Sequence, residues 1–290
     1  IKNDDNLALS NSDKIIKIRG IRLDSIDISQ AHINQRAALL VNVHHTDIKR
    51  GDYLFATENK GLQHLDRFDA SLTMSKFNTL NIGTNHQYHL YLGASHRIAR
   101  VRHLGANLYQ ISYNEPLSIH HGDRLILRDP SATKTLAGGR VIDISVPRRN
   151  RASPQRLKVL GINQLNDADA LRGLINEEPT GLHVKKFVEN RNLTLLGFKS
   201  LVREALAPSN SFTTIEDKNL GEFLLDREKY DDYKTWVEER IAQHHKENPS
   251  DKGLKISGLS TNFPVKFTVS FWSNLISKIA SEGSIQITSG

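Results

Sequence analysis

The spacing of apolar residues changes about halfway along the chain. From residue 16 to about residue 144, apolar residues recur at roughly every second position in short runs, such as 88–92, 108–111 and 125–128. Turn-forming sequences such as Arg50-Gly51-Asp52 close these runs. Short, evenly spaced strands with polar turns are typical of antiparallel barrels or sandwiches. We expect the strand at 125–128 to pair with one at 139–144 across a connection at 130–138.

After residue 154 the apolar spacing becomes helical. We expect helices at 168–175 with Asp167 as N-cap, around 182–188 with Thr180 as N-cap, and at 194–206. A hairpin of 212–215 with 222–225 follows, which completes a winged helix-turn-helix. The order then begins again, with helices at 230–247, 255–259 and 268–281 and a strand starting at 284–287.

A basic segment separates the two halves. Residues 146–154, which we call the strap, contain Pro147, Pro154, Arg148, Arg149 and Arg151. A segment of this kind is either a solvated linker or a phosphate-contacting element, and we expect the main domain boundary here. The fold predicted for the whole chain is mainly β, with barrels followed by α/β winged-helix domains.

Composition adds a preference for a polyanionic partner. The 290 residues include 39 Lys and Arg against 32 Asp and Glu, which gives a net charge of +7. Nucleic acid is the first polyanion to consider, because Lys and Arg that neutralise phosphates supply most non-specific affinity. No apolar run is long enough to span a membrane, and the first residues do not form a signal peptide. We therefore expect a cytoplasmic chain without a membrane partner.

The sequence contains no recognisable catalytic motif. Cysteine is absent, which excludes disulfides, thiol nucleophiles and cysteine-based metal sites. Neither a phosphate-binding P-loop nor a His-Glu-x-x-His metal motif is present. Adjacent histidines such as those at 44–45 and 120–121 would point to opposite faces of a strand, so they predict no metal site. We expect this chain to have no enzymatic activity and no cofactor of its own.

Several segments nevertheless resemble one family of translation factors. They are 34–39, 48–52, 89–101, 125–141 followed by Pro147-Arg148-Arg149, and Asp167-Ala168-Asp169-Ala170-Leu171. These segments are similar to the bacterial selenocysteine-specific elongation factors, the SelB family. The resemblance implies Greek-key translation-factor barrels, with the later part of the second domain at 1–58 and the third domain at 59–147. It also implies a first winged helix at 148–226 and a truncated second one at 227–290.

The resemblance implies a function in translation. Members of this family deliver selenocysteyl-tRNA to the ribosome so that UGA is read as selenocysteine. We expect GTP and Mg²⁺ to belong to a GTPase domain upstream of residue 1, and the mRNA selenocysteine hairpin to bind winged helices beyond residue 290. The missing initiator Met and the unpartnered strand at 284–287 predict that the sequence is a piece of a longer protein.

The family motifs also imply binding residues. Arg36 matches the position that lines the selenocysteyl pocket, where a guanidinium would pair with the ionised selenol; the alternative is an ordinary surface arginine. Arg100 and Arg102 should share one face of a strand, with Arg97 on the other face unless a bulge intervenes. The implied tRNA-stem contacts are Arg97, Arg100, Arg102, Asp129, Pro130, Ser131 and Lys134. The alternative for the arginines is a face that forms ion pairs between domains. The alternative for Asp129, Pro130, Ser131 and Lys134 is a plain polar turn.

A second class of function is open to the same sequence. A DNA-binding winged-helix regulator, with an N-terminal β-barrel that binds a ligand or a partner, would have the same order of elements. It would need basic residues on the helices at 194–206 and 268–281, which carry Lys199, Arg203 and Lys278. The barrels and the strap are richer in arginine, which favours the elongation factor.

Overall fold

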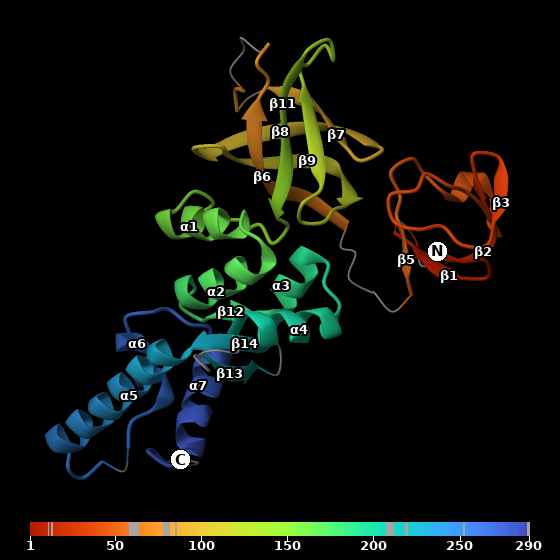
Figure 1. Cartoon of the computed structure of the whole chain (residues 1–290). Coiled ribbons are helices and arrows are strands. Elements are labelled where there is room, and N and C mark those ends of the chain that lie inside the picture. Colours follow the sequence, from red (N-terminus) through yellow and green to blue (C-terminus); the bar gives the residue numbers. More distant parts are fainter. Residues whose placement is uncertain are drawn as a thin grey trace. The chain divides into compact units, whose positions relative to one another are not determined.

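The protein forms two compact units. The computed structural model describes every residue except 11, 13, 58–63, 78–81, 85, 207–211, 218–219, 252 and 289–290. The first unit comprises Ile1–Leu160 together with Glu189–Asn192, and the second comprises Gly161–Val188 and Leu193–Gly290. Figure 1 shows β-strands in the early part of the chain and helices in the later part, as the apolar spacing predicts.

A five-stranded sheet begins the first unit. Its strands are β1 (Asn6–Leu9), β2 (Ile15–Leu23), β3 (Ile26–Ile28), β4 (Ala38–Val41) and β5 (Leu54–Ala56), with a short 3-10 helix at His45–Asp47. The sheet has the order β3-β2-β1-β5, and β4 also pairs with β2. Leu7, Ile18 and Ile21 form its buried centre.

A closed antiparallel barrel follows. It contains β6 (His64–Met74), β7 (Gln87–Leu92), β8 (Ser95–Gly105), β9 (Leu108–Ser118), β10 (Arg124–Arg128) and β11 (Thr135–Asp143) in the order β10-β11-β6-β9-β8-β7. Inward side chains such as Phe68, Leu90 and Ile111 form its buried core. Leu125 pairs with Gly139, which confirms the predicted pairing. The connection is shorter than expected, because residues 135–138 extend β11 and leave a turn at 129–134.

Helix α1 (Pro154–Asn163) was not expected from the apolar spacing. Ser153 begins it, since its hydroxyl accepts a hydrogen bond from the Arg156 backbone N–H at 3.2 Å and Pro154 occupies the first helical position. Leu157 and Leu160 pack against Leu104, Leu108 and Ile142 on the outside of the barrel. The first half of α1 therefore belongs to the barrel unit.

The second unit contains most of the predicted helices. They are α2 (Asp167–Glu177), α3 (Val184–Arg191), α4 (Leu195–Leu206), α5 (Arg227–Glu247), α6 (Ile256–Asn262) and α7 (Val269–Ser281). Strands β12 (Leu182–His183), β13 (Phe212–Asp217) and β14 (Gly221–Asp226) form a sheet in the order β12-β14-β13. We call residues 167–226 the first helical module and residues 227–281 the second. No described helix has the length and apolarity that a membrane span requires.

Three local predictions were wrong. The N-cap of α2 is Asn166, not Asp167; its side chain accepts a hydrogen bond from the Asp169 backbone N–H at 3.0 Å. Leu182 lies in a strand rather than in a helix begun by Thr180, because it pairs with Leu224 of β14. Residues 284–287 form a bend and coil, not a strand, and have no pairing partner among the described residues.

The β13–β14 hairpin supplies core residues to both helical modules. Ile215, Phe223 and Leu225 are buried together with Tyr230, Val237 and residues of α7. The Phe223 and Phe271 rings pack edge to face with centroids 5.1 Å apart. On its exposed side the hairpin is acidic, with Glu216 directly opposite Glu222. The hairpin therefore packs against both modules and is not a free, basic wing.

Candidate functional site

Two arginines of β8 project from one exposed face of the barrel. Arg100 and Arg102 are exposed and alternate with the buried Ala99 and Val101, as the period of a strand predicts. Arg100 lies between Gln87 of β7 and Ser112 of β9 in the strand register. Within the described residues, neither guanidinium has an ion pair or a hydrogen bond, so both are available to bind an external anion.

Arg97 is separated from that pair. It lies on the opposite face of β8, because the pairing of β7 with β8 runs from Ser95 to Arg100 without a bulge. Its guanidinium donates a hydrogen bond to the His96 carbonyl at 2.8 Å and lies 3.4 Å from the Glu115 carboxylate. The structure therefore brings together Arg100 and Arg102 but not Arg97.

The turn between β10 and β11 is organised by Asp129. Its carboxylate accepts hydrogen bonds from the Ser131 hydroxyl, from the Lys134 backbone N–H at 2.6 Å and from the Thr133 hydroxyl at 3.1 Å. These hydrogen bonds hold the pKa of Asp129 well below its ordinary value. The carboxylate is thus used within the turn, while Pro130, Ser131 and Lys134 are exposed.

Strand β7 links this turn to Arg100. His89 Nε2 lies 3.3 Å from the Pro130 carbonyl oxygen, and Gln87, two residues earlier, is the register partner of Arg100. The His96 ring stacks on two rings of β7: on His89, with centroids 5.0 Å apart, and on Tyr91, with centroids 4.7 Å apart. This ring stack was missed in the sequence, although outward Tyr and His residues on adjacent strands are its signal.

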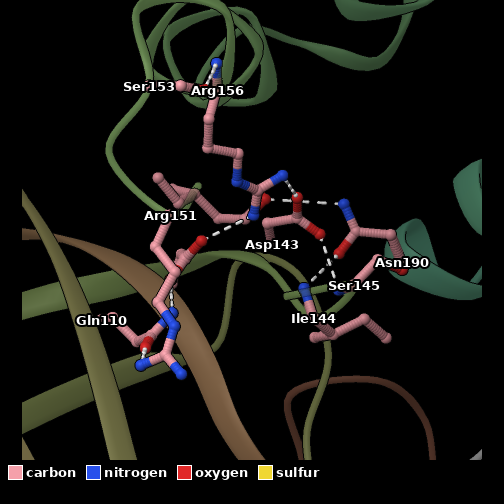
Figure 2. A network of polar contacts seen from close by, with 10 residues as sticks. Gln110, Asp143, Ile144, Ser145, Arg151, Ser153, Arg156 and Asn190 are labelled. Atoms are coloured by element: carbon pink, nitrogen blue, oxygen red, sulfur yellow. Dashed lines mark hydrogen bonds and ion pairs between the residues drawn. The ribbon is translucent and has the colours of Figure 1, made fainter. Parts of the chain in front are cut away.

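A buried ionic cluster fixes the segment after the barrel. Figure 2 shows the Arg156 guanidinium beside Asp143, at 2.7 Å, and the same group lies 2.6 Å from Asp69. Burial raises the pKa of the Asp69 carboxyl, and Arg156 opposes that effect. Beside the cluster, the side-chain oxygen of Asn190 accepts a hydrogen bond from the backbone N–H of Ile144, the residue after Asp143, at 3.1 Å. The cluster holds α1 against the barrel.

The strap is attached to the barrel rather than fully solvated. Arg151 Nη1 donates a hydrogen bond to the Gln110 side-chain oxygen at 2.8 Å, and its Nε donates to the Arg148 carbonyl at 3.0 Å. Asn150 has a φ of +53°, which turns the chain between these two residues. The solvated-linker interpretation is therefore wrong for Arg151, while Arg148 and Arg149 remain exposed.

Arg36 lies in the exposed loop between β3 and β4. Its neighbours Gln35 and Ala37 line a cavity of about 340 Å³ whose other walls include Ile1, Ile33 and Leu39. Arg36 itself is exposed, is not one of the residues that line this cavity, and has no ion pair within the described part of the chain. The loop is fixed by the Gln35 side chain, which accepts a hydrogen bond from the His32 backbone N–H at 2.7 Å.

None of the described side chains form a group of three or more His, Asp or Glu that could hold a metal ion. The exposed arginines make the candidate site a surface suited to an anionic partner, built from the outer face of β8, the turn at 129–134 and the strap.

Comparisons with known proteins agree with this architecture. The model of the family described as selenocysteine-specific elongation factor, β-barrel domain, matches residues 67–148, which include nearly all of the closed barrel. The selenocysteine-specific elongation factor of Escherichia coli K12 is 29% identical over 210 residues, which is 70% of this chain and 33% of that protein. Its counterpart in Haemophilus influenzae is 27% identical over 214 residues, with the same coverage.

A solved structure supports the fold over nearly the whole chain. The crystal structure of bacterial selenocysteine-specific elongation factor EF-Sec has a TM-score of 0.63 and 16% identity, and it covers 97% of this chain and 43% of that one. The family match and the two curated relatives make the chain related to the translation elongation factors. More particularly, it is a partial homologue of SelB, the selenocysteine-specific elongation factor, and spans about a third of the length of the curated relatives it matches.

Proposed function

We propose that this chain is the tRNA-binding part of an elongation factor that delivers selenocysteyl-tRNA to the ribosome. The observation that carries the proposal is the exposed, unpaired pair Arg100 and Arg102 on a barrel homologous to that of SelB. Guanidinium groups on a rigid strand suit phosphates of an RNA stem, because they position a duplex without reading its sequence. Exposed Lys134, near the same edge of the barrel, adds a third cation.

The same proposal assigns the other activities to parts outside this chain. GTP and Mg²⁺ would bind a GTPase domain, and the mRNA selenocysteine hairpin would bind further winged helices. Arg36 would face the selenocysteyl group, with the cavity beside it completed by other parts of the factor. Asp129 would act through the turn that it holds, and Arg97 would contribute less than Arg100 and Arg102 because its guanidinium is already paired with Glu115.

The regulator alternative has less support. A DNA-binding winged helix inserts a basic recognition helix and steadies it with a wing along the phosphates. Here the hairpin is buried on one side and carries Glu216 and Glu222 on the other. The exposed face of α4 offers Lys199 and Arg203 beside Glu204. Two cations and an acidic hairpin are a poor surface for a DNA backbone.

The test is the salt dependence of tRNA binding by the 290-residue chain. Arg100→Ala/Arg102→Ala should weaken binding of selenocysteine tRNA, and the slope of log K against log salt should fall by about 0.7–0.9 for each lost phosphate contact. Lys199→Ala/Arg203→Ala removes the same charge from α4 and should leave the slope unchanged. If the α4 variant alone lowered the slope, the regulator would be the better interpretation.

A further inference from the structure

We infer that the strap extends the tRNA-binding face of β8, so that Arg148 and Arg149 contact the phosphate backbone of the same RNA stem. This inference rests on the proposed function and adds a second binding element to it. The proposed surface, which we call the arginine strip, consists of Arg67, Arg100 and Arg102 on the barrel and Arg148, Arg149 and Arg151 in the strap.

The strand register places the barrel part of the strip on one face. Gln110 of β9 lies directly between Arg102 of β8 and Asp69 of β6. Two residues along the strands, on the same face, Ser112 lies between Arg100 and Arg67 in the same way. Directly opposed residues in an antiparallel sheet have Cα atoms about 4.5–5.5 Å apart. Arg67, Arg100 and Arg102 therefore occupy two adjacent rows on the outer side of three neighbouring strands.

The hydrogen bonds of Arg151 bring the strap to these rows. Because Arg151 binds Gln110, its guanidinium lies next to the register position of Arg102. Its second bond, to the Arg148 carbonyl, fixes the turn that carries Arg148 and Arg149. Arg148 is close enough to Asp66 to help Arg67 lower the pKa of that carboxyl. The strap is thus held at one row through the hydrogen bond of Arg151 to Gln110, and it places the charge of Arg148 near the Asp66–Arg67 pair at the other row.

The charges of the strip suit a polyphosphate rather than an acidic protein patch. The carboxylate that faces the strip from β6 is Asp66, which is already paired with Arg67 at 2.9 Å. Asp69 and Asp143 are occupied by the buried Arg156. Arg100, Arg102 and Arg149 have no ion pair within the described residues. Unpaired guanidiniums on a fixed backbone suit a polyphosphate, because each can make charge-assisted hydrogen bonds to a phosphate without first breaking an ion pair.

The experiment measures binding of a fluorescent RNA hairpin and of selenocysteine tRNA by anisotropy at several salt concentrations. Arg148→Ala/Arg149→Ala should lower the salt slope by about 1.4–1.8, the sum for two phosphate contacts. Arg148→Lys/Arg149→Lys keeps both charges and should keep the slope. Unlabelled selenocysteine tRNA should compete with the hairpin, and bound RNA should slow tryptic cleavage after Arg149.

The outcomes separate this inference from the proposed function. If the wild-type chain did not bind tRNA, or if Arg100→Ala/Arg102→Ala had no effect, the proposed function would fail. If those barrel variants weakened binding while Arg148→Ala/Arg149→Ala left both slope and affinity unchanged, the strap would play no part in binding and only this inference would fall. Circular dichroism of each variant shows whether the barrel is intact.

Discussion

The guanidinium of Arg156 lies 2.6 Å from the carboxylate of Asp69, a residue 87 positions earlier in the chain. The side chains are 12% and 1% exposed, so this ion pair is formed almost out of contact with water. Asp143 provides a second carboxylate at 2.7 Å from the same guanidinium. The helix that follows the barrel is therefore attached to it by charge as well as by apolar packing.

We predict that Arg156→Met destabilises the barrel unit by about 3–5 kcal/mol, because two buried carboxylates lose their cation. Urea denaturation, followed by far-UV circular dichroism, measures this loss of stability. Arg22→Met is the matched control, since it removes an arginine from a fully exposed pair with Asp27 and should hardly change the midpoint. Equal effects of the two substitutions would contradict the importance of burial.

The stability contributed by Asp129 should depend on pH. Its pKa is lowered in the folded state, so its contribution is complete above the ordinary pKa of about 3.9 and is lost as the pH falls through the lower folded value. The difference in urea midpoint between wild type and Asp129→Ala should be largest near neutral pH and shrink in acid. A difference that stayed constant down to the acid limit would show that the turn does not need the charged carboxylate.

Arg36→Ala should reduce the preference for selenocysteyl-tRNA over seryl-tRNA and leave the overall affinity for tRNA unchanged. If Arg36 faces the selenocysteyl group, its loss should reduce the ratio of selenocysteyl-tRNA to seryl-tRNA binding, by up to about 1.5–3 kcal/mol for a charge-assisted contact. Binding of the uncharged tRNA should stay the same. The measurement uses a full-length elongation factor that contains this chain. Equal losses for both aminoacyl forms would make Arg36 a phosphate contact or a scaffold residue.

Limited trypsin digestion should cut the strap at Arg148 or Arg149. Both residues are exposed, whereas Arg151 is bound to Gln110 and Arg156 is buried, so cleavage after those two should be slower. Mass spectrometry of the first fragments identifies the bond. Early cleavage within 125–144, inside β10 or β11, would contradict the description of the barrel as the more stable part.

The chain should neither bind nor hydrolyse GTP, because it has no phosphate-cradling loop. Isothermal calorimetry with GTP and Mg²⁺ checks this. Tight binding would show that a nucleotide site had been missed in the sequence.

Local patterns predicted most elements, and long-range pairing explains what they missed. Alternation was sufficient for β7, β9 and β10, and helical spacing for α2, α5 and α7. Strand β12 has two residues, and it is a strand only because Leu182 meets Leu224. Helix α1 was missed because Arg156 occupies an inward position of the helix and interrupts its apolar pattern. Its burial depends on carboxylates that lie far away in the sequence, such as Asp69.

The candidate site was predictable to a similar degree. Strand alternation correctly separated Arg97 from Arg100 and Arg102. It gave no indication that Arg151 would bind Gln110, since that contact joins a loop to a strand 41 residues earlier. The functional role of Asp129 was also ambiguous, because an acidic turn residue can contact a ligand or satisfy its own backbone, and here Lys134 N–H and Ser131 use its carboxylate.

The shared β13–β14 hairpin has a consequence for inheritance. Phe223 covers apolar side chains of the second helical module, so a recombination breakpoint near residue 226 would leave Phe223 exposed and remove the cover from Phe271. Neither product would keep a complete apolar interior. Recombination that separates the two modules at residue 226 should therefore destabilise both of them.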